Sequence, residues 1–184
     1  MKKIALLMSF YILFSCGSYE TSKDMKQIHA FCQLNSASGS SVVGKAMFKE
    51  TNNKVTLKID VEGLSFGYHA FHIHEFGDCS SFDAKSAGGH WNPDHNKHGK
   101  WGTESHHKGD IANLFADSSG KSSLEFETDL WCLNCDDKTK NILNKSLIIH
   151  QGPDDFHSQP SGNAGKRIAC GVINLIRNQN KLVN

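Results

Sequence analysis

The chain has 184 residues and nearly balanced charges, with 20 Lys and Arg against 19 Asp and Glu. Its length fits one domain with a buried core, and its hydrophobic fraction of 38% excludes a disordered chain. The small net charge argues against a nucleic-acid-binding protein, and no apolar run reaches the ~20 residues of a membrane span. The counts of 11 His and 6 Cys are unusual and point to metal binding, redox chemistry or secretion.

The N-terminus has the pattern of an export signal. Lys2 and Lys3 precede an apolar run over residues 4–14, which is too short to span a membrane as a stable helix. The run ends at Ser15 and Cys16, an ending that resembles the bacterial lipobox, in which a small residue precedes a cysteine that becomes lipidated. An ordinary cleaved signal with an incidental cysteine is the alternative. We expect residues 1–15 to be a lipoprotein-type signal peptide and the protein to be exported to the periplasm or cell envelope, anchored through Cys16.

The mature chain divides into a tether, one domain and a tail. Residues 16–27 are polar and lack periodicity, which is typical of a tether between a membrane and a domain. Residues 28–177 hold the regular patterns and form the predicted domain. Residues 178–184 are the expected C-terminal tail.

From residue 28 onward the dominant hydrophobic period is two, which is typical of half-buried β-strands. The clearest alternation covers residues 55–61, where four apolar residues alternate with Thr, Lys and Asp. Residues 136–144 are the one segment where we expect a short helix. Roughly eight short strands with long connections predict an all-β sandwich or barrel. The further strands are expected at residues 28–34, 42–49, 123–128, 147–150 and 168–175.

Two connections are too long to be simple turns. They cover residues 77–108 and 151–166, and long connections inside compact domains are usually functional. The first is rich in histidine. Just before it, His72 and His74 stand two apart on a predicted strand, so both imidazoles share one face. A shell of imidazole nitrogens suits copper or zinc, and one Asp oxygen is compatible with zinc.

Two segments resemble signatures of a known family. Residues 72–78, HIHEFGD, and residues 165–173, GKRIACGVI, are similar to the two signatures of the copper/zinc superoxide dismutases. The spacing between them also matches, and the similarity covers about residues 28–177. The resemblance implies an eight-stranded Greek-key β-barrel with two long functional loops. It also implies superoxide as substrate, and one copper and one zinc per subunit as cofactors.

The resemblance further implies a role for each residue of the site. Asp154 would accept hydrogen bonds from the outer nitrogens of His72 and His98, with Asp155 as the alternative. Arg167 would be catalytic beside the open copper position, and His90 would be catalytic as the bridge between both metals. The implied copper ligands are His72, His74, His90 and His150, and the implied zinc ligands are His90, His98, His107 and Asp110.

The cysteines divide by role. The resemblance implies a disulfide between Cys79 and Cys170, whereas Cys32 lies on the apolar face of its strand and is expected to be a buried thiol. Cys132 and Cys135 depart from the best-known family pattern. A local disulfide and a redox or copper-delivery role are the two interpretations of this pair.

Three other functions compete with a dismutase. A non-catalytic copper- or zinc-binding and buffering protein on the same fold is the main alternative, but storage needs neither Arg167 nor Asp154. A copper-only enzyme is disfavoured because a full zinc set is present. A zinc hydrolase is disfavoured because no general base stands out. The sequence leaves open whether the protein is a monomer or a homodimer.

Overall fold

The structure is a computed structural model that describes residues 27–177. The predicted signal peptide, Cys16, the tether up to residue 26 and the tail at 178–184 lie outside the described residues. Within the described part, nine strands and one short 3-10 helix make up the regular structure. They are β1 (Ile28–Ser36), β2 (Val43–Thr51), β3 (Lys54–Glu62), β4 (Gly67–His74), η1 (Lys85–Ala87), β5 (Asp110–Ala116), β6 (Ser122–Thr128), β7 (Ser146–His150), β8 (Arg167–Val172) and β9 (Asn174–Leu175).

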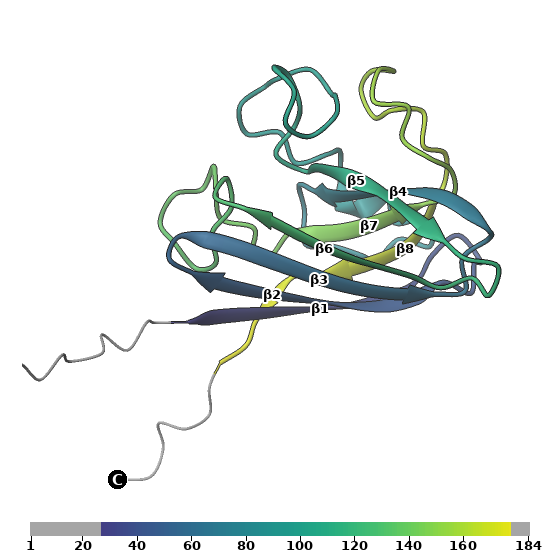
Figure 1. Cartoon of the computed structure of the whole chain (residues 1–184), viewed down its shortest axis with the longest axis horizontal. Coiled ribbons are helices and arrows are strands. Elements are labelled where there is room, and N and C mark those ends of the chain that lie inside the picture. The colour runs from purple at the N-terminus through teal and green to yellow at the C-terminus, as the bar shows by residue number, and fades with distance from the viewer. Residues whose placement is uncertain (1–26, 178–184) are drawn as a thin grey trace, which may run out of the picture.

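Eight of these strands form one antiparallel sheet that curls into a nearly closed barrel (Figure 1). Their spatial order is β5-β4-β7-β8-β1-β2-β3-β6, and the short β9 pairs with β1. The connections from β3 to β4 and from β6 to β7 cross between the two halves of this order. Such crossings are typical of Greek-key topology. The predicted eight-stranded all-β barrel is therefore confirmed.

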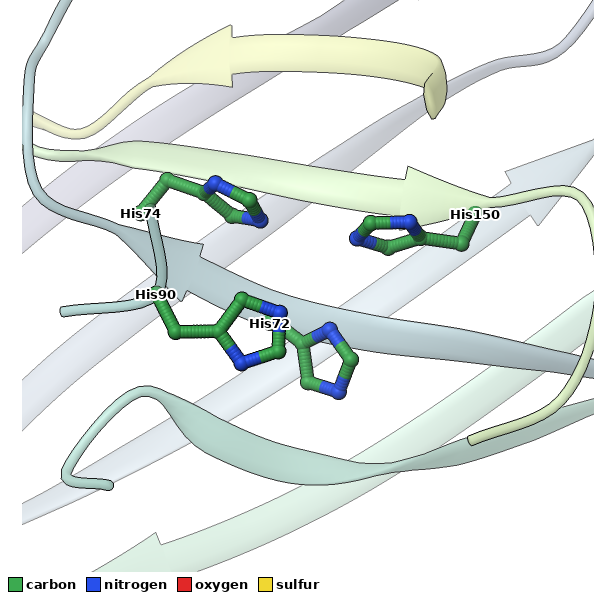
Figure 2. A group of neighbouring side chains, drawn as sticks. All are labelled: His72, His74, His90 and His150. Atoms are coloured by element: carbon green, nitrogen blue, oxygen red, sulfur yellow. The ribbon is translucent and has the colours of Figure 1, made fainter. Parts of the chain in front are cut away.

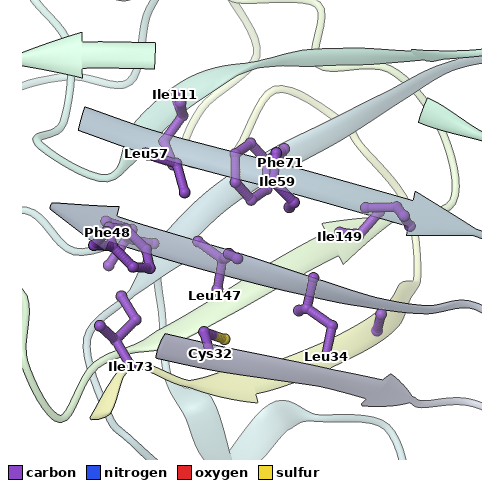
Figure 3. Close-up of a cluster of buried hydrophobic side chains, with 14 of the residues drawn as sticks. Cys32, Leu34, Phe48, Leu57, Ile59, Phe71, Ile111, Leu147, Ile149 and Ile173 are labelled. Carbon is purple, nitrogen blue, oxygen red and sulfur yellow. The ribbon is translucent and has the colours of Figure 1, made fainter. Parts of the chain in front are cut away.

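The barrel closes around the apolar faces that the period of two predicts. In β3, Val55, Leu57, Ile59 and Val61 are at most 4% exposed. β2 runs beside it in a register that pairs Leu57 with Phe48. Leu57 and Phe48 lie with side chains of β4 and β7 in one core (Figure 3). Burying a large apolar side chain contributes roughly 1.5–3 kcal/mol, so this core supplies a rigid base for the loops.

The predicted helix at residues 136–144 is wrong. This segment forms turns instead, because the Asp137 carboxylate accepts hydrogen bonds from the backbone N and the hydroxyl of Thr139, both within 2.8 Å. Such side-chain contacts to the local backbone compete with a helix. The backbone at Cys132 then pairs with Asn141, which draws the segment into an irregular loop. No helix among residues 27–177 has the length and apolarity needed to cross a membrane.

The two long connections lie together on one side of the barrel. Figure 1 shows both loops above the part of the sheet that contains β4, β5 and β7. They are joined directly: the backbone N of His98 donates to Oε1 of Gln159, and Nε2 of Gln159 donates to the carbonyl of His98, both at 2.9 Å. The loops therefore form a cover over the outer face of β4.

Candidate metal centre

Strand β4 carries core side chains on one face and histidines on the other. Phe71 and Ile73 belong to the barrel core, and because successive side chains of a strand alternate, His72 and His74 lie on the outer face. All four are at most 1% exposed, since the two loops cover the outer face. These histidines are therefore buried although they point away from the core.

Two β-bulges lie beside this face. Between β4 and β5 the register shifts next to His72, which lies opposite Asp110. Between β7 and β8 it shifts next to His150, which lies opposite Arg167. A bulge adds a residue to one strand and changes the direction in which its neighbours point. Both bulges thus bring polar side chains from neighbouring strands to the histidines of β4.

His90 comes from the first long loop but is held against β4 by backbone contacts. It forms an isolated antiparallel bridge with His74. The next residue, Trp91, donates from its backbone N to the carbonyl of Ile73 at 2.9 Å and accepts from the N of Gly109 at 3.0 Å. The His90 ring is therefore fixed between β4 and the turn that precedes β5.

The buried side chains form two groups that share His90. Within each group, one ligand atom per residue lies within 4.8 Å of all the others. Figure 2 shows the four rings of the first group converging, with His150 approaching from the end of β7. The four-histidine group is His72, His74, His90 and His150, and the histidine–aspartate group is His90, His98, His107 and Asp110.

The hydrogen bonds of the four-histidine group leave one nitrogen of each ring free. A neutral imidazole has one donor and one acceptor nitrogen, so a ring that donates to an oxygen keeps a lone pair on the other nitrogen. Three rings donate a hydrogen bond to an oxygen. His72 donates from Nε2 to Asp154 Oδ2 at 2.8 Å, His74 from Nδ1 to the Gly88 carbonyl at 2.9 Å, and His150 from Nδ1 to the Gly165 carbonyl at 3.3 Å. The remaining buried nitrogens have no hydrogen-bond partner: His72 Nδ1, His74 Nε2, His90 Nε2 and His150 Nε2.

Asp110 forms the centre of the second group. Its Oδ1 lies 2.7 Å from Nδ1 of His90 and 3.2 Å from Nδ1 of His107, and its Oδ2 lies 2.9 Å from Nδ1 of His98. The backbone N of His107 also donates to Oδ2 at 2.8 Å, which fixes the carboxylate. Three imidazole nitrogens and one carboxylate are a donor set that suits zinc.

Burial and charge set the protonation of the rings. Burial is the main reason that the pKa of His74 and that of His150 lie well below the ordinary value, and burial with the neighbouring His72 lowers the pKa of His90 to about 4. Burial also acts against a charge on His98, but hydrogen bonds to two carboxylates outweigh it and raise its pKa to about 9. The free nitrogens of His74, His90 and His150 are thus unprotonated near neutral pH, as metal binding requires.

Asp154 connects the two groups. Its Oδ2 accepts from His72, and its Oδ1 accepts from Nε2 of His98 at 2.9 Å. These hydrogen bonds overcome the effect of burial and lower the pKa of Asp154, so the carboxylate stays ionised. The other candidate, Asp155, is exposed and accepts only from nearby residues of its own turn. Asp154 is therefore the residue that the structure places behind both histidines.

Arg167 is half-buried at the edge of the four-histidine group. Its Nη1 donates to the carbonyl of Ala84 at 2.7 Å and its Nη2 to the carbonyl of Gly88 at 2.6 Å. The same Gly88 carbonyl accepts from His74. The loop thus holds the guanidinium in one orientation close to the free nitrogens.

The disulfide that the resemblance implied is present, and so is the local disulfide that was one of the two interpretations of Cys132 and Cys135. Cys79–Cys170 joins the first long loop to β8 across 91 residues, and closing a loop of that size contributes about 4–5 kcal/mol in the chain-entropy account. The other disulfide is the local pair Cys132–Cys135. Cys32 is buried, and burial raises the pKa of its thiol to about 12, so it is unreactive in the folded state.

The other histidines lie outside both groups. His69 is buried and hydrogen-bonds the carbonyls of Ser65 and His150, a structural role. His106, the neighbour of His107, bonds the carbonyl of Thr103 instead of facing Asp110. His29 is half-buried, and the exposed ones are His95 and His157.

Comparison with known proteins agrees with this geometry. Residues 42–173 match the family described as copper/zinc superoxide dismutase (SODC). The chain belongs to the copper/zinc superoxide dismutase family. Superoxide dismutase (Cu-Zn) 2 of Aquifex aeolicus is 41% identical over 178 residues, which cover 94% of this chain and 99% of that protein. Superoxide dismutase (Cu-Zn) 1 of the same organism is 43% identical and covers 71% of this chain and 79% of its own.

One relative carries a different name. The copper chaperone for superoxide dismutase of Rattus norvegicus is 31% identical over 159 residues, covering 83% of this chain and 55% of that protein. The relatives of this chain therefore include a protein named for copper delivery as well as proteins named as superoxide dismutases. The choice between these two functions therefore depends on the side chains of the site.

Sequence reasoning missed one residue that supports the site. Asn113 of β5 donates from Nδ2 to the carbonyl of Asp154 at 3.0 Å and accepts from the Asp154 backbone N at 2.8 Å. This pair of contacts fixes the backbone of the second long loop beneath His72 and His98. No signal of this role was visible in the sequence, since no strand was expected around Asn113 and its partner lies 41 residues away.

Replacing Asp154 by Asn is expected to weaken metal binding. An amide presents one oxygen, so its NH2 would face one of the two ring N–H donors. Losing such a contact behind a metal-binding histidine typically costs about 10–100-fold in affinity. Competition with a chelator for zinc and copper measures the effect, and Asp155→Asn is the matched control. Equal affinities for the two variants would contradict the linking role of Asp154.

Proposed function

We propose that this chain dismutes superoxide, converting two superoxide anions and two protons into O2 and H2O2. In this proposal the four-histidine group holds copper and the histidine–aspartate group holds zinc. The observation that carries the proposal is the position of His90, which belongs to both groups. Its Nδ1 faces Asp110, and its Nε2 is a buried free nitrogen facing the other three histidines. One imidazole with both nitrogens committed in this way would join two different metals.

The two donor sets suit two different tasks. Imidazole nitrogens accommodate copper, whereas zinc is redox-inert and favours tetrahedral sites of nitrogen, sulfur and carboxylate ligands. Bound copper supplies the one-electron oxidation and reduction that dismutation needs. Backbone contacts fix Asp110, and Asp110 in turn orients the His90 ring so that its Nε2 faces the four-histidine group.

The chain itself provides binding and proton transfer. Arg167 presents a fixed cationic guanidinium at the edge of the four-histidine group, where it can orient a small anion. His90 Nε2 is the atom at which we place the proton that the peroxide product requires. This nitrogen is buried and has no hydrogen-bond partner, so nothing else in the chain competes for that proton.

A non-catalytic copper carrier is the second candidate. The chaperone relative supports it, because such a protein shares much of this sequence. Three features favour the enzyme: the orientation of Arg167, the complete histidine–aspartate group and the Asp154 link. A copper carrier has to release its metal, so it gains nothing from buried ligands whose rings are held in place by hydrogen bonds to Asp154 and other acceptors.

We also propose that the protein is exported and lipid-anchored. The support is the sequence of residues 1–16 together with two disulfides, since disulfides persist mainly in oxidising compartments. Several acyl chains on Cys16 would give durable attachment to a membrane. Residues 17–27 would separate the barrel from the surface.

The rate of superoxide loss tests the enzyme proposal. We expect the metal-loaded protein to remove superoxide and a copper chelator to abolish the activity. Arg167→Met is expected to lower the rate at limiting superoxide by about 10–100-fold, the range for losing a hydrogen bond to a charged group. It should also reduce the dependence of the rate on ionic strength, which Arg167→Lys should restore in part.

Lys166→Met is the matched control, because it removes the same charge one residue away on an exposed side chain. An equal loss of rate in this control would show that the effect comes from net charge and not from Arg167. A protein with full copper and zinc content but no dismutation would favour the carrier.

Detergent partitioning tests the anchor. The wild-type protein expressed in a bacterium that processes lipoproteins is expected to enter the detergent phase. Cys16→Ser should move it to the aqueous phase, because the acylated atom is lost. If both proteins partition equally, residues 1–15 serve as an ordinary cleaved signal.

A further inference from the structure

The segment between β6 and β7, residues 129–145, has no part in the proposed chemistry. It leaves the end of β6 as an irregular loop (Figure 1) and contains the Cys132–Cys135 disulfide. It is nevertheless in direct contact with the turn that carries two residues of the histidine–aspartate group. What these contacts do depends on the proposed function, in which that group holds zinc.

The first contact is made by Trp131. Its indole is 1% exposed, and Nε1 donates to the carbonyl of Lys108 at 2.8 Å. Lys108 stands between His107 and Asp110, both of which belong to the histidine–aspartate group. The donor for this carbonyl comes from outside the metal loop. The indole N–H thus fixes the backbone of the turn at its middle residue.

The second contact uses the side chain of Lys108. Its Nζ donates to the carbonyl of Thr139 at 2.9 Å and lies 3.1 Å from Oδ2 of Asp94. The side chain is only 12% exposed, so solvent screens this contact little. The 129–145 segment therefore holds Lys108 at both its backbone and its ammonium group.

The third contact is aromatic packing. The Trp131 ring lies 5.7 Å from Trp101 of the first long loop and 5.2 Å from Phe126 of β6. Trp101 packs in turn against Phe126 at 4.9 Å. These edge-on and tilted arrangements are favourable for aromatic pairs. They dock the loop that carries His98 and His107 onto the barrel.

The disulfide lies directly after Trp131. Cys132 donates from its backbone N to the carbonyl of Lys140 at 2.9 Å, and the carbonyl of Cys135 accepts from Nδ2 of Asn141 at 2.9 Å. The Cys132–Cys135 bond closes the turn between these two anchor points. It therefore restricts the backbone from which the Trp131 side chain extends.

We propose that Trp131 and Lys108 are positioning residues for the zinc site, and that the Cys132–Cys135 disulfide keeps Trp131 in place. The 129–145 segment acts on the turn that presents His107 and Asp110 and makes none of the contacts of the four-histidine group. It should therefore affect zinc retention more than copper retention, which it reaches only through the contact of Asp110 with His90.

The rate of zinc dissociation from the metal-loaded protein, measured with an excess of a coloured zinc chelator, tests this proposal. Trp131→Phe keeps the aromatic packing and removes only the N–H donor. We expect it to release zinc about threefold to tenfold faster, the effect of losing one hydrogen bond. Lys108→Met, which keeps the turn backbone, should act in the same direction, as should the double variant Cys132→Ser/Cys135→Ser.

Lys140→Met is the matched control. Its ammonium group bonds the carbonyl of Asp129 within the segment itself and does not touch the zinc turn. We expect it to release zinc at the wild-type rate. In Trp131→Phe, Lys108→Met and the cysteine variant, copper dissociation, followed with a copper chelator, should change less than zinc dissociation.

Three results would overturn the proposal. They are an unchanged zinc rate in both Trp131→Phe and Lys108→Met, an equal rise in the control, and a rise in copper release that matches that of zinc. An unchanged rate in the cysteine variant would remove the disulfide from the account. A wild-type protein that binds no zinc would instead refute the proposed function, and this outcome is visible before any variant is compared.

Discussion

The metal centre depends on one constraint: each buried imidazole must give one nitrogen to an oxygen acceptor so that its other nitrogen stays free. The Gly88 and Gly165 carbonyls and the Asp154 carboxylate meet this need for three rings. Without these acceptors a buried ring would turn or lose a hydrogen bond, which costs about 1–3 kcal/mol. With them, the free nitrogens converge before any metal arrives. The geometry of the site is thus fixed by contacts behind the histidines.

The barrel provides the rigidity that these contacts require. Bulges next to His72 and His150 bring Asp110 and Arg167 to the site, and the apolar core holds the strands that carry them. The Cys79–Cys170 disulfide joins β8 to the first long loop, whose backbone carbonyls accept hydrogen bonds from the Arg167 guanidinium. A loop alone would be too mobile to keep an ion-binding geometry, so the chemistry is placed where loops lie on a sheet.

Alternation in β3 and its neighbours was sufficient to predict an all-β sandwich or barrel, and the resemblance to a known family implied the eight-stranded Greek-key form. It also placed His72 and His74 on one strand face, and the other histidines of the two groups were implied by the resemblance to the family. The acceptors at Gly88 and Gly165 were not predictable, since the direction of a backbone carbonyl leaves no trace in residue type. The Trp131 contact to Lys108 was not predictable either, because it joins two loops that are separate in the sequence. The helix expected at 136–144 does not form, because the Asp137 carboxylate stabilises a local turn instead.

The central claim is that His90 belongs to both metal sites. Counting copper and zinc in purified His90→Ala after dialysis tests it most directly, with His95→Ala as the control for an exposed histidine of the same loop. The account predicts one copper and one zinc per chain in the wild type and the control, and loss of both metals in His90→Ala. Retention of zinc at the wild-type level with loss of copper alone would contradict the bridge.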